Sequence, residues 1–248
     1  MTTTITTRTA GRVVGGMFLS GFLLYGGGSF LTNAATNGGT ALPQNATSHG
    51  QLAAGSALML ANSAAVATIG ALAFRVLRHR APRTGSGYLL TRTVEATLLA
   101  LAPLGTLLLV LLSHPGVATS DGSGSALTSL ARGAVDNGES TYWVAMAALG
   151  VGSLFFCRTM LRTGLLPPLL AVGGIVGYAI FALGSVLQLA GYDVGLALSA
   201  PGGLFEVSVG SYLLAKGFRE TVPSTAAGTS DDHTLIPRAG VVAPGAHA

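Results

Sequence analysis

Three ionisable side chains lie far inside long apolar stretches of this 248-residue chain: Arg92, Glu95 and Glu206. A charge at such a depth is costly in lipid, so it normally faces protein or water. Carboxyl groups transfer protons, and an arginine binds carboxylates and other anions. These residue types favour a proton-coupled site, a ligand site or acid–base catalysis. An equally well supported alternative is a buried ion pair that only fixes how the helices pack.

The spacing of these residues predicts that they meet at one depth. Arg92 and Glu95 are three positions apart, so they share one face of a helix. At a rise of about 1.5 Å per residue, Glu95 and Glu206 lie roughly 18 Å and 15 Å from the basic residues at their helix ends. Asn62 reaches a similar depth, roughly 20 Å by the same arithmetic. We predict a polar layer of Asn62, Arg92, Glu95 and Glu206, in which Arg92 bridges the two carboxylates.

One arginine cannot neutralise two carboxylates, so one glutamate is left able to hold a proton. Few other reactive groups accompany this layer. The five histidines do not pair at helical spacing within a span, and His49 with His114 supplies too few ligands for a metal. The single cysteine, Cys157, suits a small apolar role. There is no phosphate loop, HExxH or GxSxG motif, so we expect no metal and no cofactor.

Helices that cross a membrane must position these residues. Half of the residues are hydrophobic and only 9% are charged, whereas a soluble domain carries about 25% charged residues. The apolar stretches are about 20 residues long and continuous, which favours helices over membrane strands. The first stretch exceeds a signal-peptide core, so we expect it to be retained. We predict an all-α integral membrane bundle of six transmembrane helices with short loops, at Val13–Leu31, Leu52–Phe74, Tyr88–Leu112, Tyr142–Met160, Leu166–Leu189 and Leu196–Ala215.

The distribution of charge predicts the orientation of this bundle. Six spans place eleven of the 13 Lys and Arg residues on one side. Positive charge marks the cytoplasmic side, so both termini are predicted to be cytoplasmic in the cell membrane. The basic residues form clusters and no continuous stripe, which argues against nucleic acid as a partner. Besides marking topology, the basic loop can contact anionic lipid headgroups through Arg75, Arg78, Arg80 and Arg83.

The composition outside the spans predicts three regions. Residues 1–12 form a cytoplasmic N-terminus, residues 13–217 the transmembrane domain, and residues 218–248 a disordered cytoplasmic tail rich in Pro, Gly, Thr and Ala. The outer segment His114–Thr141 is rich in Ser and Gly, so we predict a mobile loop. It ends at Tyr142 and Trp143, which suit an anchor at the membrane interface.

Small residues recur four positions apart inside the spans. Such pairs let two helix backbones approach closely, either between two copies of the chain or within one bundle. We favour packing within the bundle and keep a homo-oligomer as the alternative. The pairs are Gly11/Gly15, Gly16/Ser20, Ala148/Gly152 and Gly173/Gly177.

Four short motifs occur in a characteristic order along the chain. They are Ala10-Gly11-Arg12, Arg92-Thr93-Val94-Glu95-Ala96, Gly164-Leu165-Leu166-Pro167, and Glu206 followed by Leu214-Ala215-Lys216-Gly217. With these motifs the chain resembles a family of bacterial membrane proteins called domain of unknown function 4386, over roughly Gly11 to Phe218. The long Ser/Gly outer loop and the extended tail depart from the family. The resemblance supports the fold and the importance of the Arg and Glu positions, and it implies no reaction.

Three functions are compatible with these observations. The first is a non-enzymatic membrane protein whose Arg/Glu layer organises the bundle and binds a lipid or small ligand. The second is a small proton-coupled transporter, although the two halves show no clear inverted repeat. The third, an intramembrane enzyme, ranks last because no nucleophile or metal set accompanies the glutamates.

Overall fold

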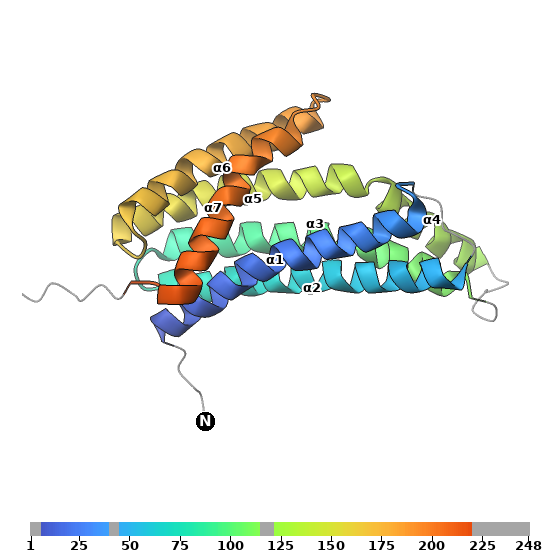
Figure 1. Ribbon diagram of the computed structural model, residues 1–248, viewed down its shortest axis with the longest axis horizontal. Helices are drawn as coiled ribbons and strands as arrows, with labels where there is room; N and C mark the ends of the chain where they lie inside the picture. The colour runs from blue at the N-terminus through green and yellow to red at the C-terminus, as the bar shows by residue number, and fades with distance from the viewer. Residues whose placement is uncertain (1–5, 40–44, 115–121, 220–248) are drawn as a thin grey trace, which may run out of the picture.

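The computed structural model describes residues 6–39, 45–114 and 122–219. Within these ranges the chain is entirely α-helical, as predicted, and has seven helices (Figure 1). They are α1 (Thr7–Thr36), α2 (Ala46–Leu77), α3 (Pro82–Leu112), α4 (Gly122–Asp136), α5 (Gly138–Thr163), α6 (Pro168–Leu189) and α7 (Gly195–Lys216).

Five of these helices, α1, α2, α3, α5 and α6, are long and apolar enough to cross a membrane. Their outward faces are apolar too, since Leu169 and Leu23 expose 86% and 78% of their surface. These features indicate a multi-pass membrane protein. The sixth predicted span corresponds to α7, which is not among the five because Glu206 and four glycines lower its hydropathy.

The six long helices form a ring. Each contacts its neighbour in the order α1, α2, α3, α5, α6 and α7, and α7 returns to α1. The seventh helix, α4, packs outside this ring against the C-terminal part of α3, where Gly105 leaves room for the backbone of Ala131. Because the ring encloses a centre, side chains on its inner faces are shielded from whatever surrounds the bundle.

The four described segments that are predicted to be cytoplasmic lie at one end of the bundle. The start of α1, the α2–α3 turn, the α5–α6 turn and the end of α7 gather there (Figure 1). Arg12 of α1 donates to the carbonyl of Ala215 at 3.4 Å, and the amide of Arg219 donates to the carbonyl of Leu165 at 3.0 Å. Arg219 and the buried Phe218 therefore belong to the folded bundle. The rest of the predicted tail lies outside the described residues.

The helices are longer than the predicted spans. Hydropathy marks only the apolar part of a helix, whereas capping sets where it begins. The side chain of Thr6 accepts from the amide of Thr9 before α1, and that of Asn45 accepts from the amide of Ser48 before α2. In the outer segment His114–Thr141, the described part is mostly helical, as α4 and the start of α5. Its Ser and Gly residues suggested a loop because both weaken an isolated helix, but packing against α3 stabilises α4.

At least one glycine in three of the four small-residue pairs packs inside the bundle. A Cβ atom on Gly15 would lie 2.6 Å from the carbonyl oxygen of Gly210 in α7, and one on Gly177 would lie 2.9 Å from that of Pro201. Gly152 similarly faces Thr91 of α3. By contrast, Gly173 is exposed, with nothing within 4 Å of its Cβ position. Homo-oligomerisation through other faces stays a prediction.

Candidate functional site

A cavity of about 280 Å³ lies at the centre of the helix ring. All six long helices contribute to its wall, and most of the lining is apolar, including Phe18, Leu99, Leu149 and Phe181. All four residues of the predicted polar layer line the same cavity. The ring therefore turns these four residues toward one cavity.

Arg92 enters the cavity wall from α3 and is only 2% exposed. Gly70 of α2 makes room for it, because a Cβ atom there would lie 2.7 Å from the Cβ atom of Arg92. The guanidinium lies between two aromatic rings, 5.2 Å from the ring centre of Phe18 and 5.1 Å from that of Tyr88. Such cation–π contacts stabilise an arginine away from water.

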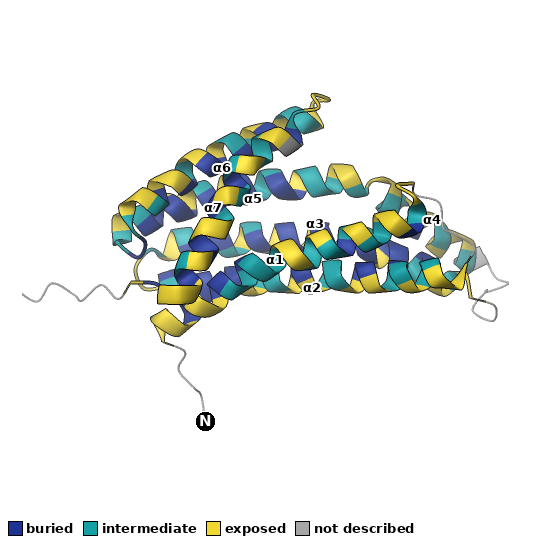
Figure 2. Cartoon of the chain, viewed as in Figure 1, coloured by how far each residue is buried: buried dark blue, intermediate teal, exposed yellow. Residues whose placement is uncertain are grey.

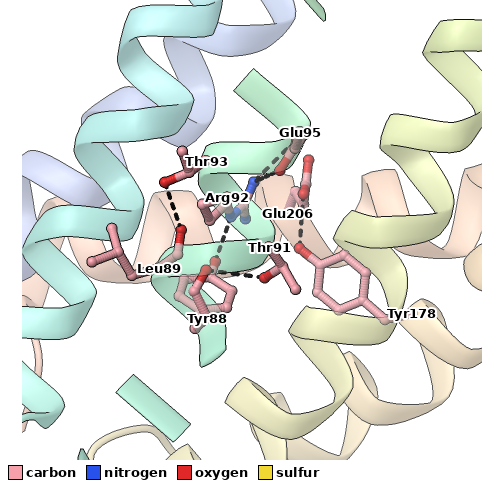
Figure 3. Close-up of polar contacts among 8 residues, drawn as sticks. All are labelled: Tyr88, Leu89, Thr91, Arg92, Thr93, Glu95, Tyr178 and Glu206. Atoms are coloured by element: carbon pink, nitrogen blue, oxygen red, sulfur yellow. Dashed lines mark hydrogen bonds and ion pairs between the residues drawn. The ribbon is translucent and has the colours of Figure 1, made fainter. Parts of the chain in front are cut away.

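The hydrogen bonds of Arg92 leave one of its nitrogens without a partner. Nε donates to the hydroxyl oxygen of Tyr88 at 2.8 Å, and Nη1 donates to both carboxylate oxygens of Glu95 at 3.0 and 3.3 Å (Figure 3). Among the residues that the structure describes, the buried Nη2 has no acceptor. A buried charged donor without a partner is unfavourable, so this nitrogen is a natural position for a ligand atom.

Glu206 reaches the cavity from α7 and makes a different contact from the one predicted. The hydroxyl of Tyr178 in α6 donates to its Oε1 at 2.7 Å (Figure 3). The only ion pair among the described residues joins Arg92 to Glu95, so the expected bridge from Arg92 to Glu206 is not formed. Glu206 remains partly exposed, and the cavity is what it faces.

Asn62 lines the cavity from α2 without joining the hydrogen bonds around Arg92. It is 6% exposed. Its Oδ1 lies beside Gly21 of α1, where a Cβ atom would come within 3.1 Å of it. The contacts of the described residues include no hydrogen bond from Asn62 to Arg92 or to either glutamate. Asn62 therefore adds polarity to the cavity wall but does not extend the ion pair.

Besides Tyr88, three tyrosines belong to the site that were not part of the predicted polar layer. Tyr178 holds Glu206, and the rings of Tyr25 and Tyr142 stack at 5.4 Å in the cavity wall. Tyr142 was predicted to anchor the chain at the interface, yet it is only partly exposed. The position of Tyr178 in the sequence could have indicated a role in the site. Tyrosine is enriched at the ends of membrane spans, whereas Tyr178 lies in the middle of one.

The side chains of this site can form hydrogen bonds with a ligand and can transfer a proton. Arg92 supplies a donor, Glu206 supplies an acceptor or a proton, and most of the surrounding wall is apolar. Within the described ranges no group of three or more His, Cys, Asp or Glu side chains is placed to hold a metal ion. Cys157 is fully buried, and the rings of His49 and His114 lie 6.2 Å apart without lining this cavity.

The family model of a domain of unknown function, DUF4386, matches residues 13–217. The chain belongs to this family. The match confirms the resemblance inferred from the motifs, and it spans every helix of the ring. Comparison with curated proteins and with solved structures gives no match. Since the DUF4386 description names no activity, function has to be argued from the site itself.

Proposed function

We propose that this DUF4386 protein binds a small ligand in its central cavity, and that Arg92 donates a hydrogen bond to the ligand. The observation that carries the proposal is the buried, unpartnered Nη2 of Arg92, a residue that lines the cavity. A layer that served packing alone would be expected to satisfy each of its charged groups, because a partly satisfied buried network is costly. The cavity also suits a ligand, since it is mostly apolar with a few polar groups.

The proposal includes the membrane arrangement. The six helices of the ring cross the cell membrane, with α7 as the sixth span and both termini in the cytoplasm. Support comes from the clusters of basic residues at the end of the bundle where α1 begins and α7 ends. The 22 residues of α7 suffice to cross the hydrocarbon core. Its Glu206 points into the ring, so it does not have to meet lipid.

Ligand binding can be measured with three ten-carbon probes: decanol, decanoate and decylamine. The protein is placed in lipid nanodiscs, and its melting temperature is followed by the fluorescence of Trp143, the single tryptophan. A ligand that binds only the folded state raises this temperature; at 100 times its Kd it stabilises by about 2.7 kcal/mol. We expect at least one probe to stabilise the protein.

Two glycine substitutions distinguish cavity binding from general effects of the probes on the lipid. Gly203 lines the cavity one turn before Glu206, and a Cβ atom there would meet only Phe22 at 3.9 Å. Gly203→Leu should fill the cavity and abolish the stabilisation. Gly87 is exposed with nothing within 4 Å of its Cβ position, so Gly87→Leu should behave as wild type. If no probe acts, or if all three proteins respond equally, the proposal is wrong.

A second candidate function, proton-coupled transport, is favoured by the partial exposure of Glu206 to the cavity. In this case Glu206 would take up and release the coupled proton. Liposomes that contain the protein and a trapped pH indicator would report a proton flux. Glu206→Gln should abolish the flux while the protein stays folded. A flux that is unchanged by this substitution would eliminate Glu206 as the proton carrier.

A further inference from the structure

We propose that the ligand is a neutral single-chain amphiphile with a hydroxyl head, and that it enters from the bilayer between α1 and α7. This inference rests on the proposed ligand-binding function and adds the chemical class and the route. Four features support it: the charges around the polar end of the cavity, its hydrogen-bonding groups, its size, and the exposed residues on its rim.

The charges at the polar end argue against an ionised head group. Arg92 and Glu95 form a pair of opposite charge, whereas Glu206 has a hydroxyl partner and no cation at hydrogen-bond distance among the described residues. An anionic head at Nη2 of Arg92 would approach the carboxylate of Glu206. A cationic head at Glu206 would approach the guanidinium. Either ionised head would therefore meet a like charge beside its partner, and it would also lose its hydration on entering a mostly apolar cavity.

A hydroxyl group matches the polar groups of two residues that line the cavity, Arg92 and Glu206. It can accept a hydrogen bond from Nη2 of Arg92 and donate one to the carboxylate of Glu206. A head that only accepts, such as an ether, would satisfy the arginine alone. Hydrogen bonds to charged groups are the stronger kind, so a ligand that makes both has a clear advantage.

The size of the cavity fits the head and part of an alkyl chain. A volume of about 280 Å³ is close to the lower end of the roughly 300–1,000 Å³ that ligand pockets occupy. Beyond the polar end the wall is formed by aliphatic and aromatic side chains, among them Leu99, Leu149 and Phe181. An alkyl chain would bury apolar surface against them, which favours binding.

The rim of the cavity lies between α1 and α7. These helices are in contact near the basic end, where Gly15 meets Gly210, and they diverge from there (Figure 1). Along the diverging part, Phe22 and Gly26 line the cavity and are themselves exposed, Phe22 by 44%. Gly203 lies beside Phe22 on this rim. Figure 2 shows exposed residues along the visible faces of both helices. In a membrane this side of the bundle faces acyl chains, so a lipid-soluble molecule would enter past Phe22.

The first experiment compares head groups on the same chain. Decanol, decyl methyl ether, decanoate and decylamine are titrated against the wild-type protein in nanodiscs. We expect decanol to bind at least tenfold more tightly than each of the other three. If any of these binds as tightly as decanol, the hydroxyl assignment is wrong, although ligand binding as such stands. If none binds, the ligand-binding function itself fails.

A variant of Glu206 tests the charge argument. Glu206→Gln keeps the size of the side chain and an acceptor for Tyr178, so the fold should be retained. Without the carboxylate charge, decanoate should bind at least fivefold more tightly than to wild type, and decylamine should bind more weakly. Decanol should change by less than a factor of three, since an amide oxygen still accepts from its hydroxyl. An unchanged affinity for decanoate would contradict the proposed position of the head.

The second experiment tests the route with a nitroxide spin label at Gly203→Cys in a Cys157→Ala background. Oxygen concentrates in lipid, whereas a charged nickel chelate stays in water, and each broadens the signal of a label that it reaches. We expect the ratio of the two effects at position 203 to match that at the outward-facing Leu183→Cys. If the ratio instead matches the one measured at His79→Cys in the exposed α2–α3 turn, the cavity opens to water. This result would overturn the proposed entry from the bilayer.

Discussion

The guanidinium of Arg92 is held by three kinds of contact at once. Glu95 balances its charge, Tyr88 accepts from Nε, and the ring centres of Phe18 and Tyr88 lie 5.2 and 5.1 Å from its central carbon. Only Nη2 is left for an external partner. The arginine is therefore positioned before any ligand arrives, and binding does not have to immobilise it.

Removing Arg92 should destabilise the protein more than removing the whole pair. Arg92→Ala leaves the carboxylate of Glu95 buried without a cation, which typically costs about 3–5 kcal/mol. Arg92→Ala combined with Glu95→Ala should regain a large part of this loss. Melting curves in nanodiscs measure both. The exposed Arg132→Ala serves as the control and should be neutral. A double variant no more stable than Arg92→Ala would disprove the role of charge pairing.

The hydroxyl of Tyr178 should contribute measurably to stability. Tyr178→Phe removes its hydrogen bond to Glu206, and a hydrogen bond to a charged group contributes about 1.5–3 kcal/mol. The expected result is a lower melting temperature for this variant and little change for Tyr192→Phe, since Tyr192 is 61% exposed. Equal effects of the two substitutions would show that the Tyr178–Glu206 contact is not stabilising.

At the scale of the helices, close contacts between glycine faces decide which helices touch. Gly11 and Gly15 lie against the end of α7, and Gly28 lies against Gly55 of α2. A side chain at any of these positions would force two backbones apart. This explains why a chain with 36 glycines still forms long helices: packing between helices offsets the low helix propensity of glycine.

Two adjacent glycines of α1 provide a matched test of this packing. A Cβ atom on Gly15 would lie 2.6 Å from the carbonyl oxygen of Gly210, whereas one on Gly16 would meet only a flexible end of Leu214 at 3.7 Å. Gly15→Ala should cost about 1–3 kcal/mol from overpacking. Gly16→Ala should be neutral or up to about 1 kcal/mol more stable, because alanine favours the helix. Melting temperatures that rank the other way would refute the close approach of α1 and α7.

The sequence predicted the helices better than their contacts. Six long helices follow from continuous apolar stretches, and Arg92 with Glu95 follows from their spacing on one helix. The partner of Glu206 did not follow, because it depends on how α6 and α7 are rotated about their axes, and depth along a helix carries no information about rotation. The helix α4 was missed for a related reason, since its stability comes from α3 and not from its own Ser/Gly-rich composition.

At the scale of the whole molecule, the basic residues of four described segments converge at one end of the bundle. The segments are distant in sequence, yet contacts such as Arg12 with Ala215 and Arg219 with Leu165 bring them together. Basic residues at both ends of the chain can lie on one side of the membrane only if the number of spans is even. Six spans meet this condition, and cysteine labelling can check the proposed orientation.

Labelling of intact cells should distinguish the two ends. In a Cys157→Ala background, Glu139→Cys at the start of α5 should react with a membrane-impermeant thiol reagent, because we place it outside the cell. His79→Cys in the α2–α3 turn should react only after the membrane is permeabilised. Both residues are exposed, so burial does not explain a difference. Reaction of both from the outside would contradict the proposed topology.

The contact between α1 and α7 joins residues more than 200 positions apart, as Arg12 and Ala215 illustrate. During synthesis the first helix reaches the membrane while its partner has not yet been translated. Its glycine face then stays uncovered until the final helix arrives, and the central cavity exists only once the ring is complete. In a chain truncated before α7 this glycine face would remain uncovered, and the α7 of another copy would be the segment that fits it.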